Sequence, residues 1–157
     1  MKFSIMSRAN IRKYFYHTLD HDCVVISITD VDSDPVDLPQ NEHIKAILRL
    51  SFEDSDEETP TSISSRDADK ITEFISRFRN TVAEIIIHCE AGISRSAGVC
   101  AALMLWLNGS DKPVFDNAYY RPNMRCYRFV LNSVESMNIG RIDKTYEWSK
   151  TKEMAFH

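Results

Sequence analysis

Cys89 and Arg95 are the two residues of this chain whose types and spacing point most directly to chemistry. Five residues separate them, an isoleucine run at 85–87 precedes the cysteine, and an apolar helical pattern follows the arginine. This order predicts a strand, a tight loop and a helix amino terminus, whose amides and dipole favour an anion. Arg95 adds a two-pronged donor, and the same field favours a cysteine thiolate. The segment therefore predicts a nucleophile that attacks a phosphate monoester.

Other residues around Cys89 are expected to support this chemistry. The predicted phosphate-binding residues are Glu90, Ala91, Gly92, Ile93, Ser94 and Arg95. Gly92 lets the loop turn and lets its amides approach a phosphate. Ser96 can donate a hydrogen bond to the thiolate, although capping of the first helical turn explains a serine there equally well. His88 points to the opposite face of the strand, so we expect a buried hydrogen-bonding side chain rather than a direct base.

Attack on a phosphate ester also requires an acid that protonates the departing oxygen. Five carboxylates follow an apolar strand-like run at 46–52, namely Glu53, Asp54, Asp56, Glu57 and Glu58. Most of this segment is expected to be a solvated acidic loop. One of its members is expected to reach the site.

Residues 88–96, His-Cys-Glu-Ala-Gly-Ile-Ser-Arg-Ser, resemble the signature loop His-Cys-x5-Arg-Ser/Thr of the cysteine-dependent protein tyrosine phosphatases. The similarity is greatest to compact microbial members of the dual-specificity branch. In that branch the acid is an aspartate just beyond the corresponding strand. Residues 52–54 resemble the Phe-Asp-Asp of the microbial relatives, which implies that Asp54 is the acid, with Asp56 as the alternative. The resemblance also implies that Asn123 supports the loop, although helix capping is the simpler explanation.

The remaining pattern predicts strands that alternate with helices. We expect a helix of about ten residues after Ser7, strands at 23–28, 46–52 and 85–88, and helices at 65–78, 94–108 and from 122 onward. A short helical turn is expected at 41–44. Alternation of this kind implies an α/β fold with parallel pairing, and the resemblance implies a central, mainly parallel sheet of four or five strands flanked by helices. A single domain spanning 1–157 is expected, with a tail at 141–157 whose structure the sequence leaves open.

Composition limits the function classes further. The chain has 157 residues and a net charge of −4, with 43% hydrophobic and 27% charged residues. We therefore expect no nucleic-acid partner and no membrane partner, and no apolar run approaches the ~20 residues that span a bilayer. No signal peptide pattern is present at the amino terminus, so a cytoplasmic, monomeric protein is expected.

The four cysteines are scattered at Cys23, Cys89, Cys100 and Cys126. They show no paired ligand spacing, so neither a metal nor a cofactor is expected. Cys23, Cys100 and Cys126 read as buried small hydrophobic residues. The alternative is that one of them captures an oxidised Cys89 as a reversible disulfide.

These observations predict a metal-independent phosphatase that acts on phosphotyrosine, and on phosphoserine or phosphothreonine, in phosphoprotein or phosphopeptide substrates. One alternative keeps the chemistry and changes the substrate to an RNA 5′-phosphate, a phosphoinositide or a small metabolite. Glu90 and the acidic loop disfavour highly anionic substrates. A second alternative is a non-catalytic phosphoprotein-binding module, which usually lacks the cysteine or the acid.

Overall fold

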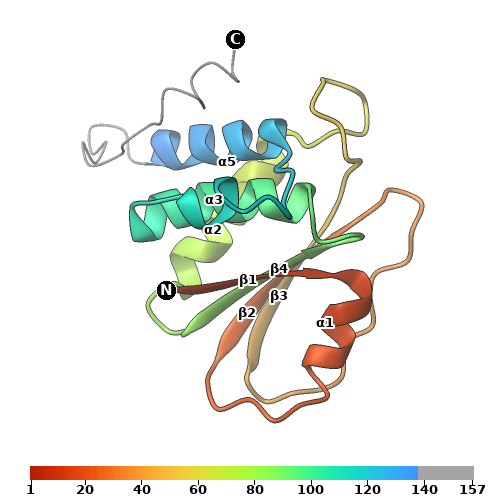
Figure 1. Ribbon diagram of the computed structural model, residues 1–157, viewed down its shortest axis with the longest axis vertical. Coiled ribbons are helices and arrows are strands. Elements are labelled where there is room, and N and C mark those ends of the chain that lie inside the picture. The colour runs from red at the N-terminus through yellow and green to blue at the C-terminus, as the bar shows by residue number, and fades with distance from the viewer. Residues whose placement is uncertain (138–157) are drawn as a thin grey trace.

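The computed structural model describes residues 1–137, and its centre is a parallel sheet of four strands (Figure 1). In chain order the strands are β1 (Lys2–Ser7), β2 (Cys23–Thr29), β3 (Ile44–Ser51) and β4 (Glu84–Cys89). They lie in the order β1-β4-β2-β3, and each neighbouring pair is parallel. The predicted α/β fold with a parallel sheet of four or five strands is therefore confirmed. The tail at 141–157 lies outside the described residues.

Helices cover both faces of this sheet. They are α1 (Arg8–Tyr14), α2 (Ser65–Phe78), α3 (Arg95–Asn108), α4 (Lys112–Phe115) and α5 (Met124–Met137). In Figure 1, α1 lies on one side of the sheet, while α2, α3 and α5 lie on the other. Within residues 1–137, no helix combines the length and the apolarity needed to cross a membrane.

β4 is wholly buried because its side chains alternate between two apolar cores. Ile85 and Ile87 pack in the core beneath α2, α3 and α5, whereas Ile86 packs with Ile11 of α1 on the other face. A parallel strand covered on both faces is typically a continuous apolar run. The isoleucine run at 85–87 thus fixes the position of β4, and its last residue, Cys89, lies at the carboxyl edge of the sheet.

Local signals set the ends of the helices on the α3 side. Ser64 precedes α2, and its Oγ accepts a hydrogen bond from the Asp67 amide at 3.2 Å while the Asp67 carboxylate accepts one from the Ser64 amide at 3.0 Å. This reciprocal pair is a capping box. Gly109 ends α3 in the left-handed region with a φ of 75°, a conformation that glycine commonly supplies at the end of a helix.

The amino-terminal half departs from the sequence prediction in several places. Residues 2–7 form β1, an edge strand whose short, half-exposed pattern does not identify it by periodicity alone. The first helix is shorter than expected and ends at Tyr14. At 41–44 the structure has a single hydrogen-bonded turn in place of the predicted helical turn, since the Ile44 amide donates to the Asn41 carbonyl at 3.1 Å and Ile44 already belongs to β3. The short helix α4 lacks a clear signal in the sequence.

A buried carboxylate links several elements at the end of the sheet opposite Cys89. Glu84, at the start of β4, has no exposed surface. It accepts hydrogen bonds from Ser4 Oγ, from the Tyr14 hydroxyl at 2.7 Å and from His21 Nε2 at 2.7 Å. Burial acts to raise the pKa of Glu84, but the hydrogen bonds outweigh it and lower the pKa. Glu84 therefore links β1, α1 and the α1–β2 connection to β4.

His21 gives this cluster a pH dependence. Its two ring nitrogens lie 2.7 Å from carboxylate oxygens of Asp20 and Glu84, and these contacts raise the pKa of His21 above its usual 6.5. The protonated ring can donate to both carboxylates, so its stabilisation is fully present below the unfolded pKa and is lost as the pH rises through the folded pKa. We predict that His21→Gln lowers the free energy of unfolding by about 1 kcal/mol near pH 6. The difference from wild type should shrink toward pH 9.

Urea unfolding of both proteins at pH 6 and pH 9 measures this difference. His17→Gln, on the same connection, is the control because no carboxylate contact is recorded for His17 in the described part of the chain. An equal loss for His21→Gln at both pH values would contradict the role of the protonated ring.

Candidate active site

The loop between β4 and α3 is packed directly against the junction of β1 and α1. Gly92 has a φ of 70°, and a Cβ added there would lie 2.7 Å from backbone atoms of Met6 and Ser7. Glycine therefore meets two requirements at this position, a left-handed backbone and a close approach of two chain segments. The close approach gives the loop a fixed support on the β1 side.

Backbone hydrogen bonds hold the loop on two further sides. The Arg8 amide donates to the Glu90 carbonyl at 3.1 Å, and the Arg121 amide donates to the Ile93 carbonyl at 3.0 Å. The amides of residues 91–94 donate to no other described residue. The Glu90 and Ile93 carbonyls are thus bound within the protein, whereas the loop amides remain available to an anion.

Cys89 and Ser96 meet beneath this loop. The Cys89 side chain is 2% exposed, and its Sγ lies 3.0 Å from Ser96 Oγ in the first turn of α3. Ser94, the residue that precedes α3, makes no side-chain capping bond, and Ser96 Oγ is committed to the sulfur. The hydroxyl of Ser96 is placed to donate a hydrogen bond to a thiolate.

Arg95 is buried, with one edge of its guanidinium group already occupied. Its terminal nitrogen Nη1 lies 2.7 Å from Asp30 Oδ1 and donates to the Phe52 carbonyl at 2.8 Å. Its Nε is buried and has no hydrogen-bond partner among the described residues. Asp30 and Phe52 therefore fix the orientation of the side chain, and the Nε edge is left without an acceptor. An unsatisfied buried donor of this kind is costly unless a ligand completes it.

Sequence reasoning missed Asp30. The residue follows β2 directly, so it lies at the same edge of the sheet as Cys89. A carboxylate that directly follows a parallel strand next to β4 was an available signal. What the sequence could not supply is the orientation that turns this carboxylate toward Arg95.

Asp54 and Asn123 form a hydrogen-bonded pair beside the Cys89 loop. Asp54 Oδ1 accepts hydrogen bonds from Ser94 Oγ at 2.8 Å and from Asn123 Nδ2 at 2.9 Å. Asn123 Oδ1 in turn accepts from the Cys126 amide at 2.9 Å, in the first turn of α5. Asn123 therefore caps α5 and contacts the carboxylate beside the loop, while its support of the loop stays a prediction.

A cleft opens beside this group. It is lined by Asp54, Asp56, Ser94, Arg121, Pro122, Asn123 and Met124. Three segments meet at this cleft, namely the β3–α2 loop, the Cys89 loop and the segment before α5. Asp56 lies on its wall, but only Asp54 bonds to the Cys89 loop.

Comparison with known proteins places this geometry in a family. A family model described as the catalytic domain of dual specificity phosphatases matches residues 13–120, more than half of the chain. The chain belongs to this family. No curated protein sequence matches it. The resemblance expected from residues 88–96 is thus confirmed at the level of the family.

Solved structures of other phosphatases share the fold. Human DUSP28 is 14% identical with a TM-score of 0.61, and the match covers 88% of this chain and 94% of that one. PTPMT1 in complex with PI(5)P is 15% identical, with a TM-score of 0.54 over 87% and 92% of the two chains. OH1 from the Orf virus is 14% identical, with a TM-score of 0.51 over 86% and 82%. At these identities the likeness establishes the fold alone.

His88 of this phosphatase lies behind the loop, on the opposite face of β4 from Cys89. It has no exposed surface, its Nδ1 lies 3.3 Å from the Cys89 carbonyl, and its Nε2 lies 2.6 Å from Ser27 Oγ. Burial, aided by nearby arginines, lowers the pKa of His88 to about 4. The ring is therefore neutral near pH 7. Because a carbonyl can only accept, Nδ1 carries the proton, and Nε2 accepts from Ser27.

The other three cysteines are buried free thiols. Cys23 begins β2, where it pairs with Glu84 at the edge of the sheet opposite Cys89, and burial raises its pKa to about 12. Burial also raises the pKa of Cys100 and Cys126. The capture of an oxidised Cys89 by one of these three cysteines as a reversible disulfide stays a prediction.

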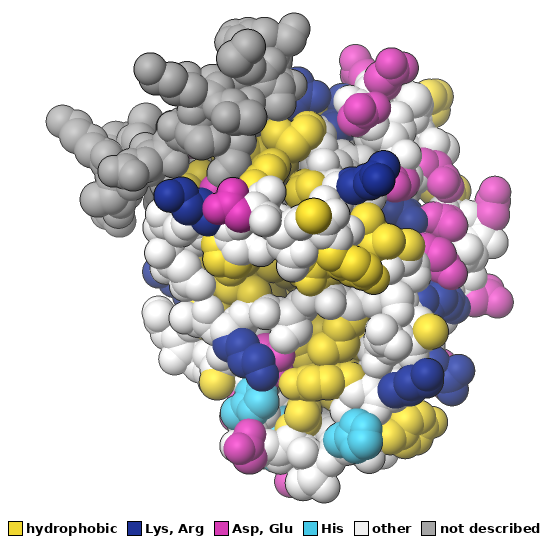
Figure 2. Space-filling view, in the orientation of Figure 1, with side chains coloured by type: hydrophobic (Ala, Val, Ile, Leu, Met, Phe, Trp, Pro, Cys, Tyr) yellow, Lys and Arg dark blue, Asp and Glu magenta, His cyan; other side chains and the backbone are white. Residues whose placement is uncertain are grey.

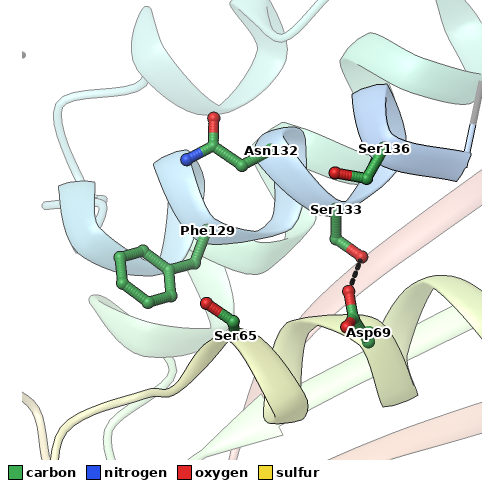
Figure 3. Close-up of a pocket in the computed structure, with 6 residues that line it drawn as sticks. All are labelled: Ser65, Asp69, Phe129, Asn132, Ser133 and Ser136. Atoms are coloured by element: carbon green, nitrogen blue, oxygen red, sulfur yellow. Dashed lines mark hydrogen bonds between the residues drawn. The ribbon is translucent and has the colours of Figure 1, made fainter. Parts of the chain in front are cut away.

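A separate hollow lies between α2 and α5 (Figure 3). Its lining residues are Ser65, Asp69, Phe129, Asn132, Ser133 and Ser136. Ser133 Oγ donates to Asp69 Oδ1 across it at 2.6 Å. No residue of the Cys89 loop lines this hollow, so the chemistry points instead to that loop and to the cleft beside it, which Ser94 lines. Among residues 1–137 no group of three or more histidine, cysteine, aspartate or glutamate side chains is arranged to hold a metal ion.

The ion pair between Asp30 and Arg95 predicts a positioning role for Asp30. Asp30→Ala should lower kcat/KM for p-nitrophenyl phosphate by about 10- to 100-fold, because Arg95 loses the charged acceptor that orients it. Asp30→Asn, which keeps an oxygen near Arg95, should lose less. The competitive inhibition constant of inorganic phosphate should weaken in parallel, because that anion binds through the same arginine.

Asp32→Ala on the same loop is the matched control, since the Asp32 side chain is exposed and bonds to no other residue within 1–137. A loss in Asp30→Ala that matches a loss of folded protein, with an unchanged inhibition constant, would show a structural role only.

Proposed function

We propose that this phosphatase removes phosphate from phosphotyrosine, and from phosphoserine or phosphothreonine, in proteins through a cysteinyl-phosphate intermediate. One observation carries the proposal. Arg95 is buried beside Cys89 with its Nε edge unsatisfied, and the adjoining amides of residues 91–94 are also without acceptors in the described chain. A phosphate group would satisfy this set of donors while its phosphorus lies over the sulfur.

The first step is an in-line attack of the Cys89 thiolate on phosphorus. The sulfur–phosphorus bond forms as the bond between phosphorus and the ester oxygen breaks. Arg95 and the loop amides stabilise the charge on the equatorial oxygens. Asp54 supplies the proton to the departing oxygen. Hydrogen bonds from Ser94 and Asn123 hold its Oδ1, and Oδ2, which bonds to no described residue, is left to carry the proton.

The second step returns the enzyme to its starting state. Water attacks the phosphorus, the sulfur–phosphorus bond breaks, and the Asp54 carboxylate accepts a proton from the water. Ser96 lies 3.0 Å from the sulfur, so its hydrogen bond stabilises the thiolate that departs. The products are inorganic phosphate and the free thiolate.

The fold limits the type of reaction more than it limits the class of substrate. The relatives include PTPMT1 in complex with PI(5)P and a viral tyrosine phosphatase that displays triple substrate specificity. A protein substrate is supported here by Glu90 in the loop and by the acidic segment that follows β3, which disfavour a polyanionic lipid or nucleic acid. Cytoplasmic location and a monomeric state remain predictions from the sequence.

Cys89→Ser should abolish turnover of p-nitrophenyl phosphate, with kcat at least about 10³-fold lower, because the hydroxyl is a poor nucleophile in this setting. Wild-type turnover should persist in excess EDTA. Cys100→Ala is the matched control, since Cys100 is a buried thiol in α3 whose side chain lies in the apolar core. Activity near wild type in Cys89→Ser would remove Cys89 from the mechanism. A folded wild-type protein without turnover would favour the non-catalytic binding module.

Asp54→Asn should lower kcat by about 10²-fold and flatten the alkaline limb of the pH profile of kcat/KM, because the amide cannot donate a proton. The loss should be larger for phenyl phosphate than for p-nitrophenyl phosphate, since phenolate is the poorer leaving group. Asp56→Asn provides the comparison. If Asp56→Asn flattens the alkaline limb while Asp54→Asn does not, Asp56 is the acid.

A further inference from the structure

Two loops of this chain are rich in acidic residues. The first spans residues 30–43 between β2 and β3, and the second spans residues 52–64 between β3 and α2. Neither range contains a lysine or an arginine. The acidic residues are Asp30, Asp32, Asp34, Asp37 and Glu42 in the first loop and Glu53, Asp54, Asp56, Glu57 and Glu58 in the second. We call the acidic residues of these two loops the acidic rim, leaving out Glu42, which lies beside the start of β3 at the opposite end of the sheet from Cys89.

The acidic rim lies on the catalytic side of the sheet. Both loops leave the carboxyl ends of strands, at the edge where Cys89 ends β4. Glu53 joins them, because its Oε1 accepts a hydrogen bond from the Val31 amide at 3.0 Å. Figure 2 shows acidic side chains gathered along the right edge of the molecule, over the two loops that Figure 1 draws there.

The rim and the bottom of the site have opposite charges. Arg95 is 5% exposed, and its unsatisfied Nε marks the place of one phosphate group. Outside that place, Asp54 and Asp56 line the cleft, and Glu57 and Glu58 are exposed beyond them. Arg121 is the single basic side chain among the described residues that line the cleft. One phosphate therefore meets positive charge at the bottom, whereas the groups beside it meet mostly carboxylates.

The exposed carboxylates of the acidic rim act on the residues of a bound substrate. Exposed carboxylates influence groups within about one Debye length, which is about 8 Å at physiological ionic strength. Residues next to the phosphorylated residue of a peptide fall within that range of the rim. Cationic flanks gain a favourable interaction there, and additional phosphates or carboxylates are repelled.

We propose that the acidic rim selects phosphopeptides in which lysine or arginine residues flank the phosphorylated residue. This inference rests on the proposed phosphatase function and deepens it by naming the substrate class. A monoanionic or dianionic phosphate on a basic peptide satisfies both regions of charge. A phosphoinositide with a second phosphate places that charge against the rim.

Two phosphotyrosine peptides of equal length test this inference, one with arginines and one with glutamates at the flanking positions. We expect kcat/KM to be about 10-fold or more higher for the arginine peptide at low salt, a ratio that corresponds to about 1.4 kcal/mol. The ratio should fall toward one as sodium chloride is raised, because exposed charges are screened. Each rate is divided by the activity of the same protein on p-nitrophenyl phosphate, which has no flanking residues.

Glu57→Gln/Glu58→Gln should reduce the arginine-to-glutamate ratio several-fold. The matched control is Glu42→Gln/Glu73→Gln, which removes two exposed charges, one beside the start of β3 and one on α2, and should leave the ratio unchanged. A ratio of one or below, a ratio insensitive to both salt and Glu57→Gln/Glu58→Gln, or faster hydrolysis of a soluble phosphatidylinositol 5-phosphate would overturn the inference. Cys89-dependent turnover of p-nitrophenyl phosphate would leave the proposed function intact in those cases. Loss of turnover on all substrates would overturn both.

Discussion

The close contact of Gly92 with the backbone of Met6 and Ser7 is the constraint on which the rest of the site depends. No side chain fits between these segments, so the loop takes its shape from β1 and α1 rather than from its own sequence alone. Hydrogen bonds to the Glu90 and Ile93 carbonyls then hold the loop on two further sides. The amides of residues 91–94 donate to no other described residue, so the loop offers an anion a set of backbone donors.

The guanidinium group of Arg95 is likewise held by the protein on one edge and left open on the other. A buried guanidinium group would be strongly unfavourable without partners, and Asp30 with the Phe52 carbonyl supplies them at one edge. The other edge is incomplete until an anion arrives. The unsatisfied Arg95 donor lowers the stability of the unliganded protein. The two apolar cores on either face of β4 offset this loss. Binding and folding are thus coupled at one side chain.

The sequence carried the parts of this structure whose signals are local. The isoleucine run of β4 and the spacing from Cys89 to Arg95 are each contained in a few adjacent residues, and the fold class followed from the alternation of strand-like and helical segments. The roles of Asp54 and Ser96 stay predictions that the geometry favours. β1 and Asp30 escaped sequence reasoning for one reason. Their importance comes from neighbours far along the chain, and neither a short edge strand nor a single aspartate has a periodic pattern.

The position of β1 has a consequence for how the protein acquires activity. In the order β1-β4-β2-β3, the first strand to be synthesised pairs with β4 alone, Lys2 beside Glu84 and Ser7 beside Cys89. During synthesis β1 therefore waits without a strand partner until β4, the last strand among the described residues, has left the ribosome. Closing so long a loop is among the slow events of folding. The nascent chain completes its sheet and assembles the support of its catalytic loop in the same late step.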